Sequence, residues 1–222
     1  MIIMSTFAKQ LLQTFHGTDP YAEFPYQNHP LDLQGGPEDA LFGRLIQQYR
    51  PRLIVEVGTW KGSSALQLAA GLKTQGTDGA VICIDTWLGS LEHLTKKVPG
   101  WNLGQNFSHG YPTLYFQFLA NVLHKGLQDF IVPLPTTSTI GARLLAQYHL
   151  QADMVYLDGS HDEEDVYQDL AHYWKVLRPG GLCFGDDWEA FWYGVICGVN
   201  RFVKENELNL QVAGTKWFLR KP

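Results

Sequence analysis

"ADMVYLDGSHDEEDVYQDLAHYWKVLRPGGLCFGDDW", residues 152–188, contains two short apolar runs that are separated by a helical pattern. The first run ends at Asp158, and the second ends at Asp186 and Asp187. Continuous apolar runs of this kind are typical of parallel strands that are buried on both faces of a sheet. Because clustered carboxylates repel one another, three of them at two strand ends indicate a cation, a hydroxyl-rich ligand or a proton to be moved.

The rest of the chain repeats this alternation of strand and helix. Strands are predicted at residues 52–58, 80–87, 129–136, 152–158 and 181–187, with two last strands around Gly214. Helices are predicted at residues 37–50, 63–73, 113–126, 139–148, 162–177 and 189–206. The expected fold class is α/β, with a doubly wound, mostly parallel seven-stranded sheet whose last strand is antiparallel. In such sheets ligands bind beyond the carboxyl ends of the strands.

The length of 222 residues suits one domain with a large core. We expect a short helix over residues 5–15 and a Pro-rich loop, which together form an N-terminal extension at 1–36, and then the α/β domain at 37–222. Pro37 and the two acids after it mark the start of the first helix of that domain. The long loop from Leu88 to Pro112 is expected to contact the substrate.

Composition narrows the class of protein. The chain has 17 Lys and Arg against 22 Asp and Glu, a formal net charge of −5, which argues against a nucleic-acid partner. No apolar run approaches the roughly 18 residues that a membrane-spanning helix needs, and the N-terminus lacks the basic leader of a signal peptide. Cys83, Cys183 and Cys197 lie within apolar stretches, as core cysteines of a reduced, cytoplasmic protein do.

The first predicted strand ends in a glycine-containing turn, "VEVGTWKGSSA" at residues 55–65. Glycines in the turn, Gly58 and Gly62, let the backbone approach a ligand closely, and the helix that Ser63 or Ser64 opens favours an anionic or polar group at its N-terminus. We therefore expect Thr59 and Ser64, with the two glycines, to bind a cofactor. A turn that only eases packing is the alternative.

A nicotinamide cofactor is disfavoured by the same turn. A G-x-G-x-x-G motif places glycine at the second position after the first one, where this chain has the bulky Trp60. A Tyr-x-x-x-Lys pair is also missing from the expected region. An NAD-dependent oxidoreductase is therefore a third alternative.

Glu56 stands two residues before Gly58, and Asp85 ends the second strand in "CIDTW". With this arrangement the chain resembles class I S-adenosylmethionine-dependent methyltransferases from about residue 37 to 222, which implies their Rossmann-like fold and an activity in EC class 2.1.1. Asp85 can accept hydrogen bonds from both ribose hydroxyls, and Glu56 can organise the turn or meet the methionine ammonium. Thr86 and Trp87 would complete the cofactor site, with Trp87 either flat against adenine or simply packed in the core.

Thr137 and Ser138 follow the third strand in "PTTST". The resemblance implies that these residues recognise the edge of adenine, although the family tends to have an acid or Gly-Asp-Ser there. The alternative is that the hydroxyls cap the next helix, a role that we expect for Ser138.

The "LDGSH" and "GDD" motifs are most similar to those of small-molecule O-methyltransferases. That group includes metal-dependent sugar methyltransferases of antibiotic pathways and, more distantly, catechol O-methyltransferase. The resemblance implies that Asp158, Asp186 and Asp187 bind Mg²⁺, or Mn²⁺ or Ca²⁺, which suit hard oxygen ligands. The cation would lower the pKa of an acceptor hydroxyl. The alternative is that Asp186 or Asp187 caps a helix and Asp158 bonds to a loop.

His161 lies three residues after Asp158, where the catechol enzymes have a lysine as general base. A histidine can accept a proton near neutral pH, so His161 and Asp158 are the predicted catalytic residues. A helix cap or a surface position is the other interpretation of His161.

The expected function is cation-assisted O-methylation of a small hydroxylated acceptor. A non-catalytic subunit that binds the adenosine cofactor within a biosynthetic complex is the alternative from another class. The aromatic residues Tyr21, Phe24 and Tyr26 of the N-terminal loop suit either a neighbouring subunit of a homo-oligomer or the chain's own site.

Overall fold

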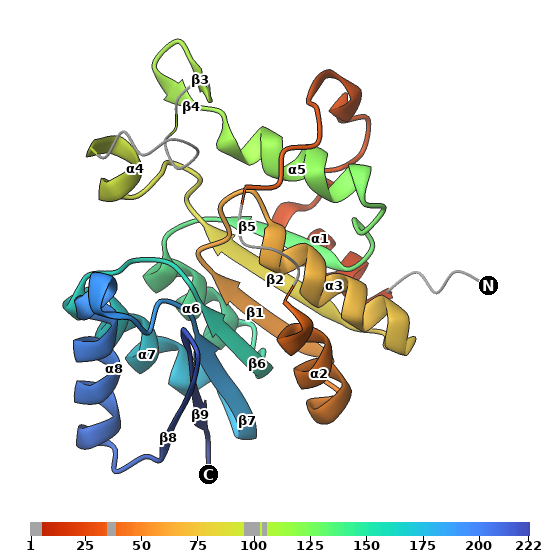
Figure 1. The fold of residues 1–222 in the computed structure, drawn as a ribbon. Helices are drawn as coiled ribbons and strands as arrows, with labels where there is room; N and C mark the ends of the chain where they lie inside the picture. The colour runs from red at the N-terminus through yellow and green to blue at the C-terminus, as the bar shows by residue number, and fades with distance from the viewer. Residues whose placement is uncertain (1–5, 35–38, 96–102, 104–105) are drawn as a thin grey trace.

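The computed structural model describes residues 6–34, 39–95, 103 and 106–222. Its main feature is a seven-stranded sheet in the order β5-β2-β1-β6-β7-β9-β8 (Figure 1). The strands are β1 (Leu53–Val57), β2 (Ala80–Asp85), β5 (Ile131–Pro135), β6 (Ala152–Leu157), β7 (Leu177–Gly185), β8 (Leu210–Ala213) and β9 (Lys216–Arg220). The first five of these pair in parallel and β9 pairs antiparallel with β7, which confirms the predicted fold class.

Helices cover both faces of the sheet, as the alternating pattern predicted. Figure 1 shows α2 (Ala40–Tyr49) and α3 (Ser63–Gln75) on one face, and α6 (Ser138–Gln147), α7 (Glu163–Val176) and α8 (Tyr193–Glu205) on the other. A short helix, η2 (Ala190–Trp192), precedes α8. The predicted start of α2 at Pro37 lies outside the described residues, and the described helix is capped by Asp39, whose side chain accepts from the backbone nitrogen of Leu41 at 2.8 Å.

The central strands are buried because both of their faces meet helices. Every residue of β1 is buried, and so are the first five of β2, in agreement with their predominantly apolar sequence. Pro133 and Pro135 lie in β5, which is an edge strand, where the missing backbone N–H of proline is tolerated. Cys83 and Cys183 are buried, Cys197 is half-buried, and all three are free thiols.

The C-terminal hairpin of β8 and β9 places residues of β9 beside the end of β7. Gly214 takes a positive φ of 61° in the turn between β8 and β9, where glycine has no steric cost. Trp217 of β9 pairs with Gly185 of β7, and a Cβ on Gly185 would lie 2.4 Å from the indole. The missing side chain therefore lets the hairpin pack closely beside Asp186.

The N-terminal segment packs on the domain. Helix α1 (Thr6–His16) buries Ala8, Leu11 and Leu12, and the Tyr21 hydroxyl donates to the carbonyl oxygen of Ile131 at 3.1 Å. Tyr21 is only 5% exposed, so the expectation of a surface aromatic is wrong for this residue, because its ring belongs to the core.

The other two aromatic residues of the N-terminal loop contact their own chain. Phe24 stacks on Phe116 of α5 (Leu114–His124), and Tyr26, in the short helix η1 (Tyr26–Asn28), meets the ring of His124 edge-on. The division between residues 36 and 37 falls outside the described residues.

The segment that was expected to be a long loop contains short elements. These are α4 (Leu91–Thr95), β3 (Phe107–Ser108) and β4 (Tyr111–Pro112), and the last two form a hairpin that stands away from the sheet in Figure 1. Part of the predicted substrate loop, residues 96–102 and 104–105, lies outside the described residues. Substrate contact by this segment stays a prediction.

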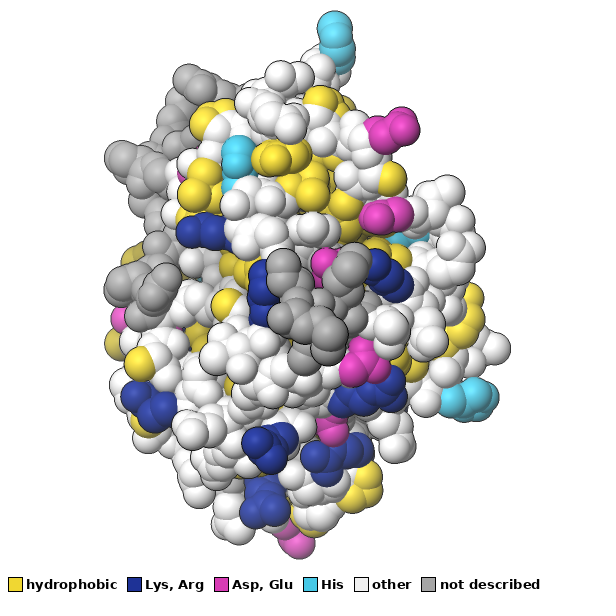
Figure 2. All heavy atoms as spheres, turned by 90° about the vertical axis from the view of Figure 1, so that its right-hand side faces the viewer, with side chains coloured by type: hydrophobic (Ala, Val, Ile, Leu, Met, Phe, Trp, Pro, Cys, Tyr) yellow, Lys and Arg dark blue, Asp and Glu magenta, His cyan; other side chains and the backbone are white. Residues whose placement is uncertain are grey.

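Figure 2 shows the face that lies to the right in Figure 1. Lys and Arg side chains gather in its lower half together with acidic ones, and hydrophobic side chains are more frequent in its upper half. Leu31, Leu33 and Phe116 are among the exposed hydrophobic residues of the N-terminal loop and α5. Within the described ranges, the helices are all too short or too polar to cross a membrane.

Candidate active site

A cleft of about 1160 Å³ lies beyond the carboxyl ends of β1, β2, β5, β6 and β7. This is the position that the doubly wound architecture predicts for a ligand. The predicted site residues on its wall are Gly58, Thr59, Ser64, Asp85, Thr86, Thr137, Ser138, Asp158, His161, Asp186 and Asp187. The wall does not include Glu56, Gly62 or Trp87.

The turn after β1 requires its two glycines. Gly58 has a φ of 80°, and a Cβ on it would lie 2.2 Å from the carbonyl oxygen of Asp158, so no other residue fits between the ends of β1 and β6. Gly62 has a φ of 91° at the N-cap of α3, and its Cβ would lie 2.8 Å from the ring of Phe118. These close approaches bring the cofactor turn and the acidic end of β6 together.

Asp85 organises the same turn through its carboxylate. Its Oδ2 accepts from the backbone nitrogens of Thr59 at 2.8 Å and Trp60 at 2.9 Å, and its Oδ1 accepts from that of Trp87 at 2.7 Å. A carboxylate has about four acceptor positions, so Asp85 keeps about one of them for a ligand. The prediction that Asp85 holds both ribose hydroxyls is thereby narrowed to about one further hydrogen bond.

Glu56 lies beneath the turn and is fully buried. Burial raises the pKa of Glu56 to about 8, and the hydroxyls of Ser64 and Thr59 oppose this rise only in part. Neither of its carboxyl oxygens has a hydrogen bond of normal geometry within the described part of the chain. Of the two predicted roles, this position favours organising the turn over contact with a methionine ammonium.

Trp87 is 1% exposed and lies in the core. Its indole nitrogen donates to the carbonyl oxygen of Trp60 at 2.8 Å, and its ring packs against Tyr115 and Phe118. The packing alternative therefore describes Trp87, and the adenine-stacking interpretation does not.

An aromatic pair that the sequence analysis did not single out lies on the cleft wall instead. The rings of Trp60 and His93 stack with centroids 4.0 Å apart and an interplanar angle of 13°. His93 comes from α4, within the segment 88–112, where no periodic pattern predicts a position beside Trp60.

The helix cap after β5 is Thr137 rather than Ser138. The Thr137 side chain accepts from the backbone nitrogen of Ile140 at 3.3 Å, so the predicted capping role of Ser138 is wrong. Ser138 is the first residue of α6, and its hydroxyl donates to the carboxylate of Asp169 on α7. Burial raises the pKa of Asp169 to about 6. Asp169 was missed because it lies in the middle of a helical pattern, far from any motif.

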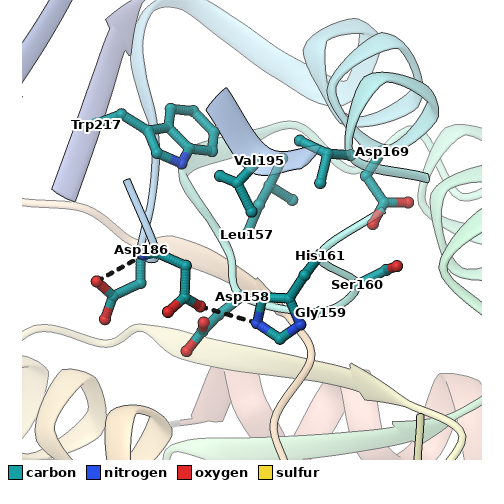
Figure 3. Close-up of a pocket in the computed structure, with 11 residues that line it drawn as sticks. Leu157, Asp158, Gly159, Ser160, His161, Asp169, Asp186, Val195 and Trp217 are labelled. Carbon is teal, nitrogen blue, oxygen red and sulfur yellow. Dashed lines mark hydrogen bonds and ion pairs between the residues drawn. The ribbon is translucent and has the colours of Figure 1, made fainter. Parts of the chain in front are cut away.

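The three predicted carboxylates lie together at the ends of β6 and β7, and Figure 3 shows Asp158, Asp186 and His161 around the same space. Burial, the charge of Asp187 and the charge of Asp186 raise the pKa of Asp158 to about 7. Lys216 and a hydrogen bond from the Tyr156 hydroxyl at 3.0 Å oppose this rise. Asp158 can therefore exchange a proton near neutral pH.

Asp186 is already paired with a cation. The ammonium of Lys216 donates to its Oδ2, while the Thr215 hydroxyl at 2.6 Å and the backbone nitrogen of Asp187 at 2.9 Å donate to its Oδ1. Burial raises the pKa of Asp186, but the bonds from Lys216 and Thr215 outweigh burial and lower it below its usual value. Asp186 is an anion in this site.

His161 is held between Asp187 and Trp192. Its Nε2 lies 3.0 Å from Oδ2 of Asp187, and its ring stacks on the indole of Trp192 with centroids 3.7 Å apart. Nδ1, the other ring nitrogen, is buried. His161 and Asp158 both lie on the cleft wall, and the general-base role of His161 stays a prediction.

The three carboxylates do not form the divalent-cation site that the resemblance implied. Within the described ranges, no group of three His, Cys, Asp or Glu side chains has an arrangement that could hold a metal ion. Two of the three carboxylates already have partners, since Asp186 is paired with Lys216 and Asp187 with His161. Helix capping does not explain the acids either, since the residue at the N-cap of η2 is Glu189.

The fold and this cleft define a class I S-adenosylmethionine-dependent methyltransferase. A family model described as a methyltransferase domain matches residues 55–188, which is more than half of the chain, so the chain belongs to that family. A search of curated proteins found no match. Membership of this family sets the nicotinamide-dependent alternative aside.

Two solved structures share the fold at low sequence identity. The O-methyltransferase from Bacillus cereus in complex with SAH has 16% identity and a TM-score of 0.61 over 100% of both chains. The O-methyltransferase TomG from Streptomyces achromogenes, involved in tomaymycin synthesis and in complex with SAM, has 15% identity and a TM-score of 0.60, covering 97% of this chain and 89% of its own.

Proposed function

We propose that this protein transfers the methyl group of S-adenosylmethionine to a hydroxyl oxygen of a small acceptor, with Asp158 as the general base. The observation that carries the proposal is the position of Asp158. It lies on the cleft wall at the end of β6, against the cofactor turn, with a pKa raised to about 7.

The cofactor half of the cleft is the turn from Gly58 to Ser64 together with Asp85. Bound S-adenosylmethionine supplies an electrophilic methyl group on a positively charged sulfur. Gly58 lies on the cleft wall and packs against the backbone of Asp158, and Asp85 keeps about one acceptor position for a hydroxyl. Trp60 and His93 offer a flat aromatic wall to the cleft.

The acceptor half contains Asp158 and the pair of His161 with Asp187. Oδ2 of Asp158 accepts from the Tyr156 hydroxyl, and in this scheme the other oxygen, Oδ1, accepts the proton of an acceptor hydroxyl. Asp158 would hold that proton, while bound S-adenosylmethionine would supply the methyl group to the acceptor oxygen. His161 fixes Asp187 close to Asp158 and is a positioning residue in this scheme.

Oxygen methylation of a small molecule is supported by the size and polarity of the cleft. Its wall combines carboxylates with the aromatic rings of Trp60, Trp192 and Phe191, which suits a hydroxylated acceptor. The structural neighbours described above are O-methyltransferases, and one of them is involved in tomaymycin synthesis. A divalent cation is not part of the proposal, because Lys216 already holds Asp186.

The test is transfer of a labelled methyl group from S-adenosylmethionine to a panel of catechols, flavonoids and sugars. Asp158→Asn is expected to lower turnover by about 10²- to 10⁴-fold, the usual contribution of a general base, while calorimetric binding of S-adenosylmethionine persists. The matched control is Asp162→Asn, which makes the same change at an exposed side chain before α7. Binding of the cofactor without turnover of any acceptor would favour the non-catalytic partner subunit.

A further inference from the structure

Lys216 comes from the C-terminal hairpin and reaches the acidic end of the cleft. It is 9% exposed, and its ammonium donates to Oδ2 of Asp186 and lies 4.0 Å from Oδ2 of Asp39. The ring centroids of Phe42 and Tyr156 lie 5.8 Å and 5.9 Å from the same nitrogen. Two aromatic faces and a carboxylate therefore fix the charge in one place.

The charge of Lys216 has no counterpart elsewhere on the described wall of the cleft. That wall includes Lys216 as its single Lys or Arg. The acidic residues on the same wall are Asp39, Asp85, Asp158, Asp165, Asp169, Asp186 and Asp187. A cluster of carboxylates needs a nearby positive charge if more than one of them is to be ionised, so Lys216 decides the charge state of the acceptor end.

We propose that Lys216 is the resident cation of the acceptor site and takes the place of a divalent metal there. The ammonium neutralises Asp186, and its hydrogen bond to Oδ2 uses one of its three donors, so it can also hold an oxygen of the acceptor. A metal ion at this position would likewise compensate the carboxylate charge and bind an oxygen of the acceptor. The role of Lys216 in holding the acceptor rests on the proposed function. Its role in place of a metal ion does not depend on that function.

A divalent ion and Lys216 would exclude one another. A metal bound to Asp186 would have to displace the ammonium from Oδ2 or lie beside it, and two cations at that distance repel strongly in a partly buried site. Removal of the ammonium should therefore create the metal site that the wild-type chain lacks.

The test is calorimetric titration of the 222-residue chain, saturated with S-adenosylhomocysteine, with Mn²⁺. The wild-type chain is expected to bind no Mn²⁺ up to about 1 mM, and Lys216→Met is expected to bind it at least about tenfold more tightly. Lys216→Arg keeps the charge and should behave like wild type. The double variant Lys216→Met with Asp186→Asn should lose the gained site, and Lys204→Met changes an exposed lysine on α8 as the control.

A second measurement follows turnover of an identified acceptor in EDTA. Wild-type turnover should be unchanged, and turnover of Lys216→Met should fall at least about tenfold and recover in part in Lys216→Arg. Wild-type binding of Mn²⁺ at micromolar concentration, or loss of wild-type turnover in EDTA, would overturn the proposal. These two results come from the wild-type chain, so they decide the question even if Lys216→Met does not fold.

The two proposals fail in different ways. If the wild-type chain methylates no acceptor, the proposed function is wrong, and the Mn²⁺ titration still decides the role of Lys216. If an acceptor is methylated only with added metal, the function holds and the role of Lys216 is wrong.

Discussion

Replacement of Glu56 by Gln should change how the stability of the protein depends on pH. Glu56 is fully buried, and its pKa rises from an ordinary 4.5 to about 8 in the folded protein. At a pH between these two pKa values, Glu56 is protonated in the folded chain and ionised in the unfolded chain. The resulting stabilisation is fully present below the lower pKa and is lost as the pH rises through the higher one.

The magnitude follows from the two pKa values. Within that interval the free energy of unfolding should fall by about 1.4 kcal/mol for each pH unit because of Glu56 alone. From about pH 5 to about pH 7.5 this contribution sums to about 3 kcal/mol. Gln has nearly the same shape and cannot ionise, so Glu56→Gln should lack this slope and be more stable than wild type at about pH 7.5.

The assay is urea denaturation followed by tryptophan fluorescence, at several pH values, without ligand. The quantity to compare is the difference in free energy of unfolding between Glu56→Gln and wild type as a function of pH. Glu189→Gln makes the same chemical change at an exposed position and is the matched control. A difference for Glu56→Gln that stays constant from about pH 5 to about pH 7.5 would refute the reasoning about the buried proton.

Three further predictions concern residues of the site. The value of kcat/KM for methyl transfer should rise with pH and level off near pH 7, where Asp158 loses its proton, and the pH profile of Asp158→Asn should lack this limb. Thr137→Ala should cost about 0.5 to 2 kcal/mol in urea denaturation because α6 loses its cap, whereas the same measurement on Ser138→Ala should show no loss of a cap. Trp87→Ala should lower the free energy of unfolding by about 3 to 5 kcal/mol as a core cavity forms, and a loss near zero would mean that the ring lies in the cleft.

The fold was predictable because its decisive signals are local. Runs such as "AVICI", residues 80–84, are apolar without alternation, a pattern that is typical of a strand covered on both faces. The carboxyl ends of such strands then meet at one edge, which is why Asp85, Asp158 and Asp186 could be placed in one cleft from sequence.

The charge partners of the site were not predictable in the same way. Lys216 is far from every motif in the sequence, and it reaches Asp186 only because the hairpin around Gly214 returns antiparallel to β7. Trp87 and Ser138 show a second limit, since a tryptophan or a hydroxyl after a strand fits two roles equally well. Tertiary packing alone decides between them, and it placed Trp87 in the core and gave the cap to Thr137.

The cofactor turn is tied to the N-terminal segment by one ion pair. Lys61, 2% exposed between Trp60 and Gly62, forms that pair with Asp32, and Asn121 bonds to the backbone oxygens of both residues at 2.8 Å. Removal of the first 38 residues would leave a buried positive charge beside the glycines of the turn. A shortened chain should therefore lose cofactor affinity although every residue of the cleft wall from position 39 onward is kept. Among homologous chains, positions 32 and 61 should co-vary, because a change of charge at one position leaves the charge at the other without its partner.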